Sequence, residues 1–298
     1  MRHGRRRFVA GFLALPLVMY AVLVLSPYAQ AFYLALTDWR GVSARAEFVG
    51  LDNFARLLDD PQMWAGLRNN GLMLLVIPVV TILLALLLAA LLTLGRSGRG
   101  VRGAGAYRVV YFFPQLLSVA VIGVLWQFVY TPNNGLLNGV LEAFGIAGRS
   151  WLADPALALW AVMAVVVWSS TGFYVVLFCA AMQSIPREIL EAAHVDGAGR
   201  FTVFRTIVLP LVRENIQVAY IYLGIGALDG FALVQIMTVG PGGPDNATEV
   251  LGLGLYRNAF TYGQFGYASA LGVVLFFLTL TLAVLVMRTS RRERIEVV

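Results

Sequence analysis

The segment Ser184–Glu214, SIPREILEAAHVDGAGRFTVFRTIVLPLVRE, is a polar insert between two long apolar runs. It holds four acidic residues and four arginines, and glycine and proline punctuate it. Charged side chains are costly inside a bilayer, so this insert is expected to lie outside the membrane as a loop between two membrane-spanning helices. A loop of this size and charge is typical of a surface that docks a partner protein.

The composition assigns the whole chain to the membrane class. Of its 298 residues 59% are hydrophobic and 13% are charged, and the mean hydropathy is +0.78. A soluble domain has about a quarter of its residues charged, so a soluble protein of this composition would lack a polar surface. The net charge of +6 would suggest nucleic acid in a soluble protein, but the arginines here have a topological explanation, and no nucleic-acid partner is expected.

Six apolar segments are long enough to cross a hydrocarbon core about 30 Å thick, which takes about 20 helical residues. Backbone groups in lipid must pair within the segment, so each is expected to be an α-helix. The predicted spans are Phe8–Leu36, Gly71–Leu94, Tyr107–Tyr130, Ala156–Met182, Asn215–Ile236 and Phe265–Met287. The expected fold is therefore all-α, with six transmembrane helices in a single transmembrane domain over residues 1–298.

The distribution of arginine predicts the orientation. The N-terminus, the second loop, the fourth loop and the C-terminal tail hold four arginines each, against six in the loops of the other side. The positive-inside rule then places both termini and residues 184–214 in the cytoplasm of a multi-pass plasma-membrane protein. Arg5-Arg6-Arg7 and Ala29-Gln30-Ala31 also fit a cleaved signal peptide, but the apolar run between them is longer than an h-region of about 7–15 residues.

The first extracytoplasmic loop is expected over residues 37–70. Its leucines and Phe54 recur at helical spacing from Leu51 to Leu58, and Asp52 or Asn53 can cap the start. This pattern predicts a short amphipathic helix, either an interfacial anchor or part of a landing surface for an external partner. In the fifth loop, GPGGP at residues 240–244 cannot be helical and predicts a sharp turn.

Few residues could hold a metal or perform covalent chemistry. Cys179 is the only cysteine, and the two histidines, His3 and His194, are far apart in sequence, so no metal site is expected. Paired acids and nucleophile–base motifs are absent, so no catalytic residue is expected. The phosphate-binding pattern G-x-x-x-x-G-K-[ST] is also missing from the sequence, so ATP would have to bind to a separate polypeptide.

Local signals within residues 184–214 define a docking helix. Pro186 and Gly197 bracket a helix predicted over Arg187–Asp196, since proline suits the first helical turn and glycine the residue beyond the end. Small alanines on it allow close approach of a partner, and Glu191 offers a charge for an arginine. A second turn, Phe201–Ile207, supplies apolar anchors before the chain returns to the membrane. The residues expected to contact the partner are Glu191, Ala192, Ala193, Asp196, Gly197, Phe204, Leu209 and Pro210.

The same residues carry a family resemblance. Glu191-Ala192-Ala193, Asp196-Gly197-Ala198, Phe204, Ile207 and Leu209-Pro210 stand at the spacing of the EAA loop of ABC importer permeases, EAA-x-x-DGA-x-x-x-x-x-F-x-x-I-x-LP. The resemblance extends over nearly the whole chain, through FFPQLLSVAVIGVLW and MTVGPGGPDNATEVLGLGLYRNAF, to the F-type subunit of maltose-type sugar importers. Glu214, where a proline often stands, and Ala232, where many relatives have Asp, depart from the pattern.

The resemblance implies a type I ABC importer permease that moves a carbohydrate, of oligosaccharide size, from an external binding protein into the cytoplasm. It further implies a second, G-type permease subunit and a homodimeric ATPase on the cytoplasmic face that binds ATP and Mg. This chain itself would be no enzyme and need no cofactor, and lipid would surround it. The alternative is an ion-coupled secondary transporter or channel with Asp229, the one acid inside a predicted span, as its coupling site.

Two predicted spans present faces suited to a sugar. In the fourth, Ser170, Thr171 and Tyr174 share one helical face, where a ring can stack on C–H patches and hydroxyls can exchange hydrogen bonds. The alternative is that Ser and Thr bond their own backbone while the aromatic residues pack against neighbouring helices. The expected substrate-pathway residues are Trp168, Ser170, Thr171, Tyr174, Tyr220, Gly224, Ala227 and Asp229.

Overall fold

The computed structural model describes residues 2–42, 46–93, 101, 103–238, 240 and 242–290, with the backbone alone at residues 2–10, 194, 289 and 290. These residues are mostly helical. Within them no strand forms, and the only β-type pairing is an isolated bridge between Thr37 and Phe48. The all-α class is confirmed. The arginine clusters at residues 96–102 and 291–294, Leu94 at the end of the second predicted span and Pro241 lie outside the described residues.

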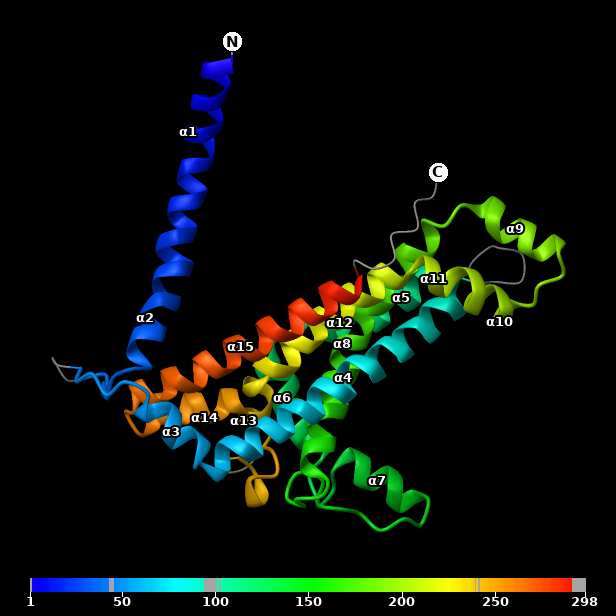
Figure 1. Cartoon of the computed structure of the whole chain (residues 1–298). Helices are drawn as coiled ribbons and strands as arrows, with labels where there is room; N and C mark the ends of the chain where they lie inside the picture. Colours follow the sequence, from blue (N-terminus) through cyan, green and yellow to red (C-terminus); the bar gives the residue numbers. More distant parts are fainter. Residues whose placement is uncertain are drawn as a thin grey trace. The chain divides into compact units, whose positions relative to one another are not determined.

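The elements up to the middle of the chain are α1 (Arg2–Tyr20), η1 (Ala21–Leu25), α2 (Ser26–Leu34), α3 (Asp52–Leu58), α4 (Pro61–Thr93), α5 (Ala104–Phe112), η2 (Phe113–Leu116), α6 (Val119–Val129), α7 (Leu136–Ala143) and α8 (Ala158–Gln183). The remainder are α9 (Arg187–Val195), α10 (Arg200–Val203), η3 (Phe204–Val208), α11 (Leu209–Leu211), α12 (Arg213–Asp229), α13 (Phe231–Met237), η4 (Pro244–Asn246), α14 (Leu251–Tyr256), η5 (Arg257–Thr261) and α15 (Phe265–Ser290). Figure 1 shows them in chain order by colour.

Four stretches are long and apolar enough to cross a membrane as continuous helix: Gly11–Leu34, Pro61–Thr93, Ala158–Gln183 and Phe265–Arg288. Two further spans are bent pairs. Ala104–Leu116 meets Val119–Val129 at 97°, and Arg213–Asp229 meets Phe231–Met237 at 49°. Counting each pair as one span gives the predicted six.

The two bends correct the prediction that the third and fifth spans are uninterrupted helices. In the third, Pro114 lies in a short 3₁₀ turn, Leu117 is extended (φ −79°, ψ 143°), and the Ser118 hydroxyl accepts a hydrogen bond from Val121 N at 3.3 Å to start α6. In the fifth, Gly230 leaves the helical region with ψ 32°. A hydropathy pattern does not predict these breaks, because the residues around them remain apolar.

The elements form two compact units, Met1–Met63 with Gly254–Phe277, and Trp64–Leu253 with Leu278–Val298. In the first unit, α3 forms as predicted in the first loop, although neither Asp52 nor Asn53 caps its start. The Asn53 amide is instead buried and donates to the carbonyl oxygens of Ala35 at 2.9 Å and Thr37 at 2.8 Å. The helix is therefore tied down by a side chain that faces inward.

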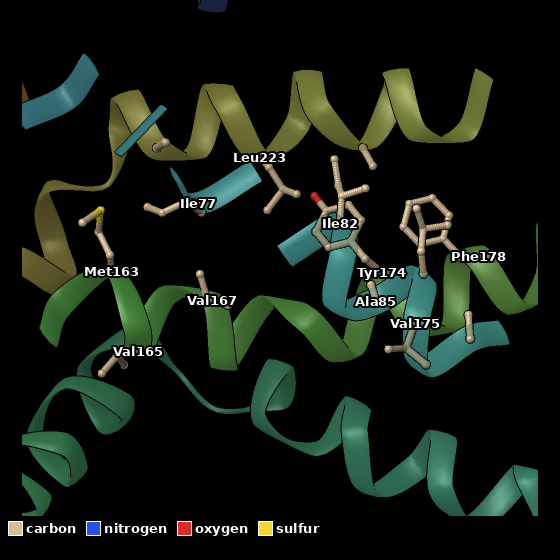
Figure 2. Packing of buried hydrophobic residues seen from close by; sticks show 14 of the residues in the cluster. Ile77, Ile82, Ala85, Met163, Val165, Val167, Tyr174, Val175, Phe178 and Leu223 are labelled. Carbon is tan, nitrogen blue, oxygen red and sulfur yellow. The ribbon is translucent and has the colours of Figure 1, made fainter. Parts of the chain in front are cut away.

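In the second unit, α4, α8 and α12 pack around a continuous apolar core. Figure 2 shows Tyr174 and Phe178 of α8 beside Ile82 of α4, with Leu223 of α12 nearby. Phe178, like Ala85 of α4, has no exposed surface. Small side chains such as Ala85, Ala89 and Ala161 lie among the larger ones in this core, which lets the helices approach closely.

The closest approach in this unit is between α5 and α8. Gly172 of α8 lies directly against the backbone of Tyr111, so that a Cβ at this position would overlap the Tyr111 carbonyl group. A backbone obstacle cannot rotate away as a side chain can.

We therefore expect Gly172→Ala to destabilise the protein, with a cost at the upper end of the about 1–3 kcal/mol that overpacking produces. Gly226→Ala in α12 is the matched control, because a Cβ there meets no atom within 4 Å. Thermal unfolding in detergent should show a lower midpoint for the first variant only. Equal midpoints would contradict the close approach of α5 and α8.

Candidate functional site

A cavity of about 490 Å³ lies in the second unit. Polar groups on its wall come from the α5–α6 region, α8 and α12, while α4 contributes an apolar floor with Met73 and Ile77. The polar lining residues are Gln115, Ser169, Ser170, Tyr174, Tyr222 and Asp229. Serine, tyrosine and glutamine both donate and accept hydrogen bonds, so the wall can bind a neutral polar solute.

Both helix breaks open onto this cavity. Leu117 and Val119, on either side of Ser118, line it, and so does Gly230. Irregular backbone at membrane depth is tolerated where it is buried in protein or lines a cavity. The breaks therefore help to form the site, because the third and fifth spans bend at the residues that line the cavity.

Of the predicted pathway residues, Ser170, Tyr174, Ala227 and Asp229 line the cavity. The hydroxyl of Thr171 instead donates to the carbonyl oxygen of Val167 at 2.6 Å, the backbone bond considered as the alternative. The remaining three residues also lie outside the lining. Trp168 packs edge-on against Trp126 with ring centroids 5.2 Å apart, Tyr220 is partly buried against the core, and Gly224 faces Leu74 and Leu282.

The cavity face of α12 differs from the face predicted for it. Tyr222, Gly226 and Asp229 line the cavity, a stripe with i, i+4, i+7 spacing. The predicted stripe runs through Tyr220 and Gly224 and leaves out Tyr222. The sequence pattern that could have indicated this face is an aromatic residue, a glycine and an acid at i, i+4 and i+7.

Asp229 is the one charged side chain among the described residues that line the cavity. Its placement there agrees with the expectation that an acid within a span faces the interior of the bundle. No arginine stands in this lining to balance it.

The polar loop at residues 184–214 contains the predicted helix as α9, Arg187–Val195. Gly197 has φ +78°, and the Ala198 amide donates to the Ala193 carbonyl oxygen at 2.9 Å. This is the glycine-terminated helix end that the sequence predicted, since a residue with a side chain rarely adopts positive φ.

The surface of the loop differs in part from the predicted contact set. Glu191, Ala192, Asp196, Gly197 and Pro210 are exposed, whereas Ala193 is buried. Two predicted apolar contacts, Phe204 and Leu209, are partly buried against this chain's own core. The most exposed large apolar side chains of the loop are instead Val195, 88% exposed, and Phe201, 75% exposed.

Apolar helices around a polar-lined cavity, with an exposed charged loop, are typical of membrane permeases. The chain belongs to the family of binding-protein-dependent transport system inner membrane components, whose model matches residues 72–295. It is thus a multi-pass permease subunit of an ABC importer, which sets aside the ion-coupled alternative.

The chain is similar to the diacetylchitobiose uptake system permease protein NgcF of Streptomyces coelicolor, with 46% identity over 294 residues, covering 96% of this chain and 83% of that protein. It is also similar to the lactose transport system permease protein LacF of Rhizobium radiobacter, with 30% identity over 95% of this chain and 94% of that one. Its fold resembles a chain in the crystal structure of a bacterial ABC transporter that imports the acidic polysaccharide alginate, with TM-score 0.81, 22% identity, and coverage of 98% and 97% of the two chains.

Cysteine labelling tests the cavity lining directly. We expect Ser170→Cys to react with a small polar methanethiosulfonate and Thr171→Cys to react about tenfold more slowly, because thiol reactivity follows exposure. The native Cys179 is buried and gives little background. Equal rates at the two positions would show that the cavity wall has been assigned to the wrong face of α8.

Proposed function

We propose that this chain carries a neutral carbohydrate of oligosaccharide size through the membrane. The observation that supports this most is the cavity wall, where Ser170, Tyr174 and Gln115 supply hydroxyl, ring and amide groups without any cation. Sugars bind through aromatic faces and exchanged hydrogen bonds, and this wall offers both. The relatives named for diacetylchitobiose and lactose uptake agree with this substrate class.

The charge of the cavity supports a neutral substrate over an anionic one. Asp229 would repel a carboxylate, sulfonate or phosphate, and the described lining holds no arginine to neutralise it. An ion of that sign at membrane depth needs a counter-charge. A vicinal pair of sugar hydroxyls, by contrast, can donate to both oxygens of one carboxylate.

The importer class implies an ATPase and a substrate-binding protein as partners. We further propose that the ATPase is a homodimer on the cytoplasmic face that alone binds ATP and Mg, and that a second, G-type permease completes the membrane channel. Both termini and residues 184–214 would lie on the cytoplasmic side, as the arginine distribution predicts. This subunit then holds no cofactor and hydrolyses no nucleotide itself.

The docking surface for the ATPase is proposed on α9 and the turn after it. Glu191 and Asp196 present charge, while Val195 and Phe201 expose apolar area that water disfavours. Apolar anchors within a polar rim are typical of protein interfaces. Closure of the ATPase dimer would move α9 as a lever and rock the spans between two openings of the cavity.

Reconstitution tests the proposal. Liposomes holding this chain, its partner permease and ATPase should take up diacetylchitobiose or lactose only with ATP inside and binding protein outside. Alginate oligosaccharide, an anion, should not enter. Uptake of the anion in preference to neutral sugars would overturn the substrate class.

Filling the cavity should block transport without preventing assembly. We expect Ser170→Leu to reduce sugar uptake by about tenfold or more, because an apolar side chain replaces a hydroxyl in the site. Thr171→Val, which keeps volume and lies outside the lining, should transport normally. Normal uptake by the first variant would remove Ser170 from the pathway.

Distorting the end of α9 should uncouple ATP hydrolysis from uptake. Gly197→Val places a β-branched residue at φ +78°, whereas Gly199→Val puts the same side chain at φ −69° and ψ 159° with open space around it. We expect normal membrane levels of both by immunoblot and loss of uptake in the first alone. If the Gly197 variant transports like its control, α9 is not the coupling element.

A further inference from the structure

Two adjacent buried asparagines on α4 connect three separate parts of the second unit. Asn69 is 5% exposed and Asn70 is 1% exposed. A buried amide without partners is costly, so the bonds that satisfy these side chains fix the structure around them. Neither asparagine is among the predicted site residues.

Among the described residues, the Asn69 side chain donates hydrogen bonds only to the loop at residues 242–250. Its Nδ2 donates to the carbonyl oxygens of Glu249 at 2.8 Å and Ala247 at 3.1 Å. The loop is itself closed by Thr248, whose backbone N and Oγ1 both donate to the Gly242 carbonyl oxygen at 2.9 Å. The loop is thus a compact unit held against α4.

Asn70 makes contacts on two sides. Its Oδ1 accepts from Leu251 N at 2.8 Å, at the point where the 242–250 loop enters α14. Its Nδ2 donates to the carbonyl oxygens of Ala227 at 3.1 Å and Leu228 at 3.3 Å. These carbonyls belong to the last turn of α12, where a helix leaves carbonyls without partners of its own.

The α12 side of this contact is the wall of the cavity. Ala227, Asp229 and Gly230 all line it, and Gly230 is the break in the fifth span. Asn70 itself lies on the stripe of α4 that continues through Met73 and Ile77, which form the apolar floor. One side chain therefore joins the loop to the hinge of the cavity wall.

Close backbone packing leaves little slack in this junction. A Cβ at Gly66 would lie 3.1 Å from Leu251 N, and a Cβ at Gly252 would lie 3.0 Å from the Cβ of Phe231, the first residue of α13. Displacement of the loop is consequently transmitted to the ends of α12 and α13 rather than absorbed locally.

We infer that Asn70 is a positioning residue for transport, which couples the 242–250 loop to the cavity wall at Ala227–Gly230. The inference rests on the proposed function and adds to it that the binding protein docks on the face of the permease that carries this loop. Docking there moves the loop, and Asn70 passes the movement to the hinge at Gly230. Asn69 anchors the loop without reaching α12 and so lacks this role.

The test uses the complete reconstituted transporter with Gly226→Cys as a reporter. Gly226 lines the cavity, and a Cβ there meets no atom within 4 Å. The labelling rate by a small methanethiosulfonate is measured with and without binding protein loaded with diacetylchitobiose. In the otherwise unmodified chain, we expect the binding protein to change this rate by about fivefold or more, the range of a typical coupling between sites.

Asn70→Asp keeps the acceptor for Leu251 N but turns an oxygen toward the two α12 carbonyls. We expect this variant to lose the change in labelling rate, while Asn69→Asp keeps the full change and needs more binding protein to reach it. Equal behaviour of the two variants, or no change in the chain that carries only the reporter, overturns the inference.

Asn70→Leu, which keeps the shape and removes every polar atom, replaces Asn70→Asp if the latter does not accumulate in the membrane. Failure of both, with normal levels of Asn69→Asp, would assign Asn70 a purely structural role and also overturn the inference. The proposed function is judged separately, by diacetylchitobiose or lactose uptake through the chain with neither asparagine changed.

Discussion

Every backbone amide and carbonyl at membrane depth must find a partner within the protein, and the rest of this structure depends on that constraint. Unbroken helix satisfies it by default, as in α4 and α8. Where the chain departs from helix, at Ser118 and Gly230, the structure supplies local partners: a serine hydroxyl at the start of α6 and the Asn70 amide at the end of α12. Both helix breaks line the cavity, and these hydrogen bonds satisfy the backbone groups that the breaks leave without a helical partner.

The number of spans and the fold class could be predicted because long apolar runs allow only one solution in lipid. The bends could not, because they depend on single residues within runs that stay apolar. The start of α4 at Pro61 extends ten residues before the predicted span, since the polar first turns, capped by Asp60 on the Gln62 amide at 2.8 Å, do not register as hydrophobic. Hydropathy predicts the part of a helix that lies in lipid, whereas the end of the helix is predicted by its capping residues.

For the candidate site, the sequence identified the right helices but only half of the right faces. On α8, Ser170 and Tyr174 line the cavity while Thr171 bonds its own backbone. On α12 the favoured stripe ran through Tyr220 and Gly224, each two residues before the lining residues Tyr222 and Gly226. In the 184–214 loop, Gly197 was predictable from its own chemistry, whereas the burial of Phe204 depends on a core formed by distant residues. Features decided by local geometry were accessible, and those decided by tertiary packing were not.

The contact between Gly172 and the backbone of Tyr111 has a mechanical consequence. At this point the backbones of α5 and α8 touch and nothing between them can rotate aside, so the two helices are expected to move together. On the opposite wall, Gly226 of α12 borders open space. Around Gly226 the cavity can widen without movement of α8, while Asn70 holds the end of α12. The substrate would then stay against the groups on α8 while the middle of α12 moves.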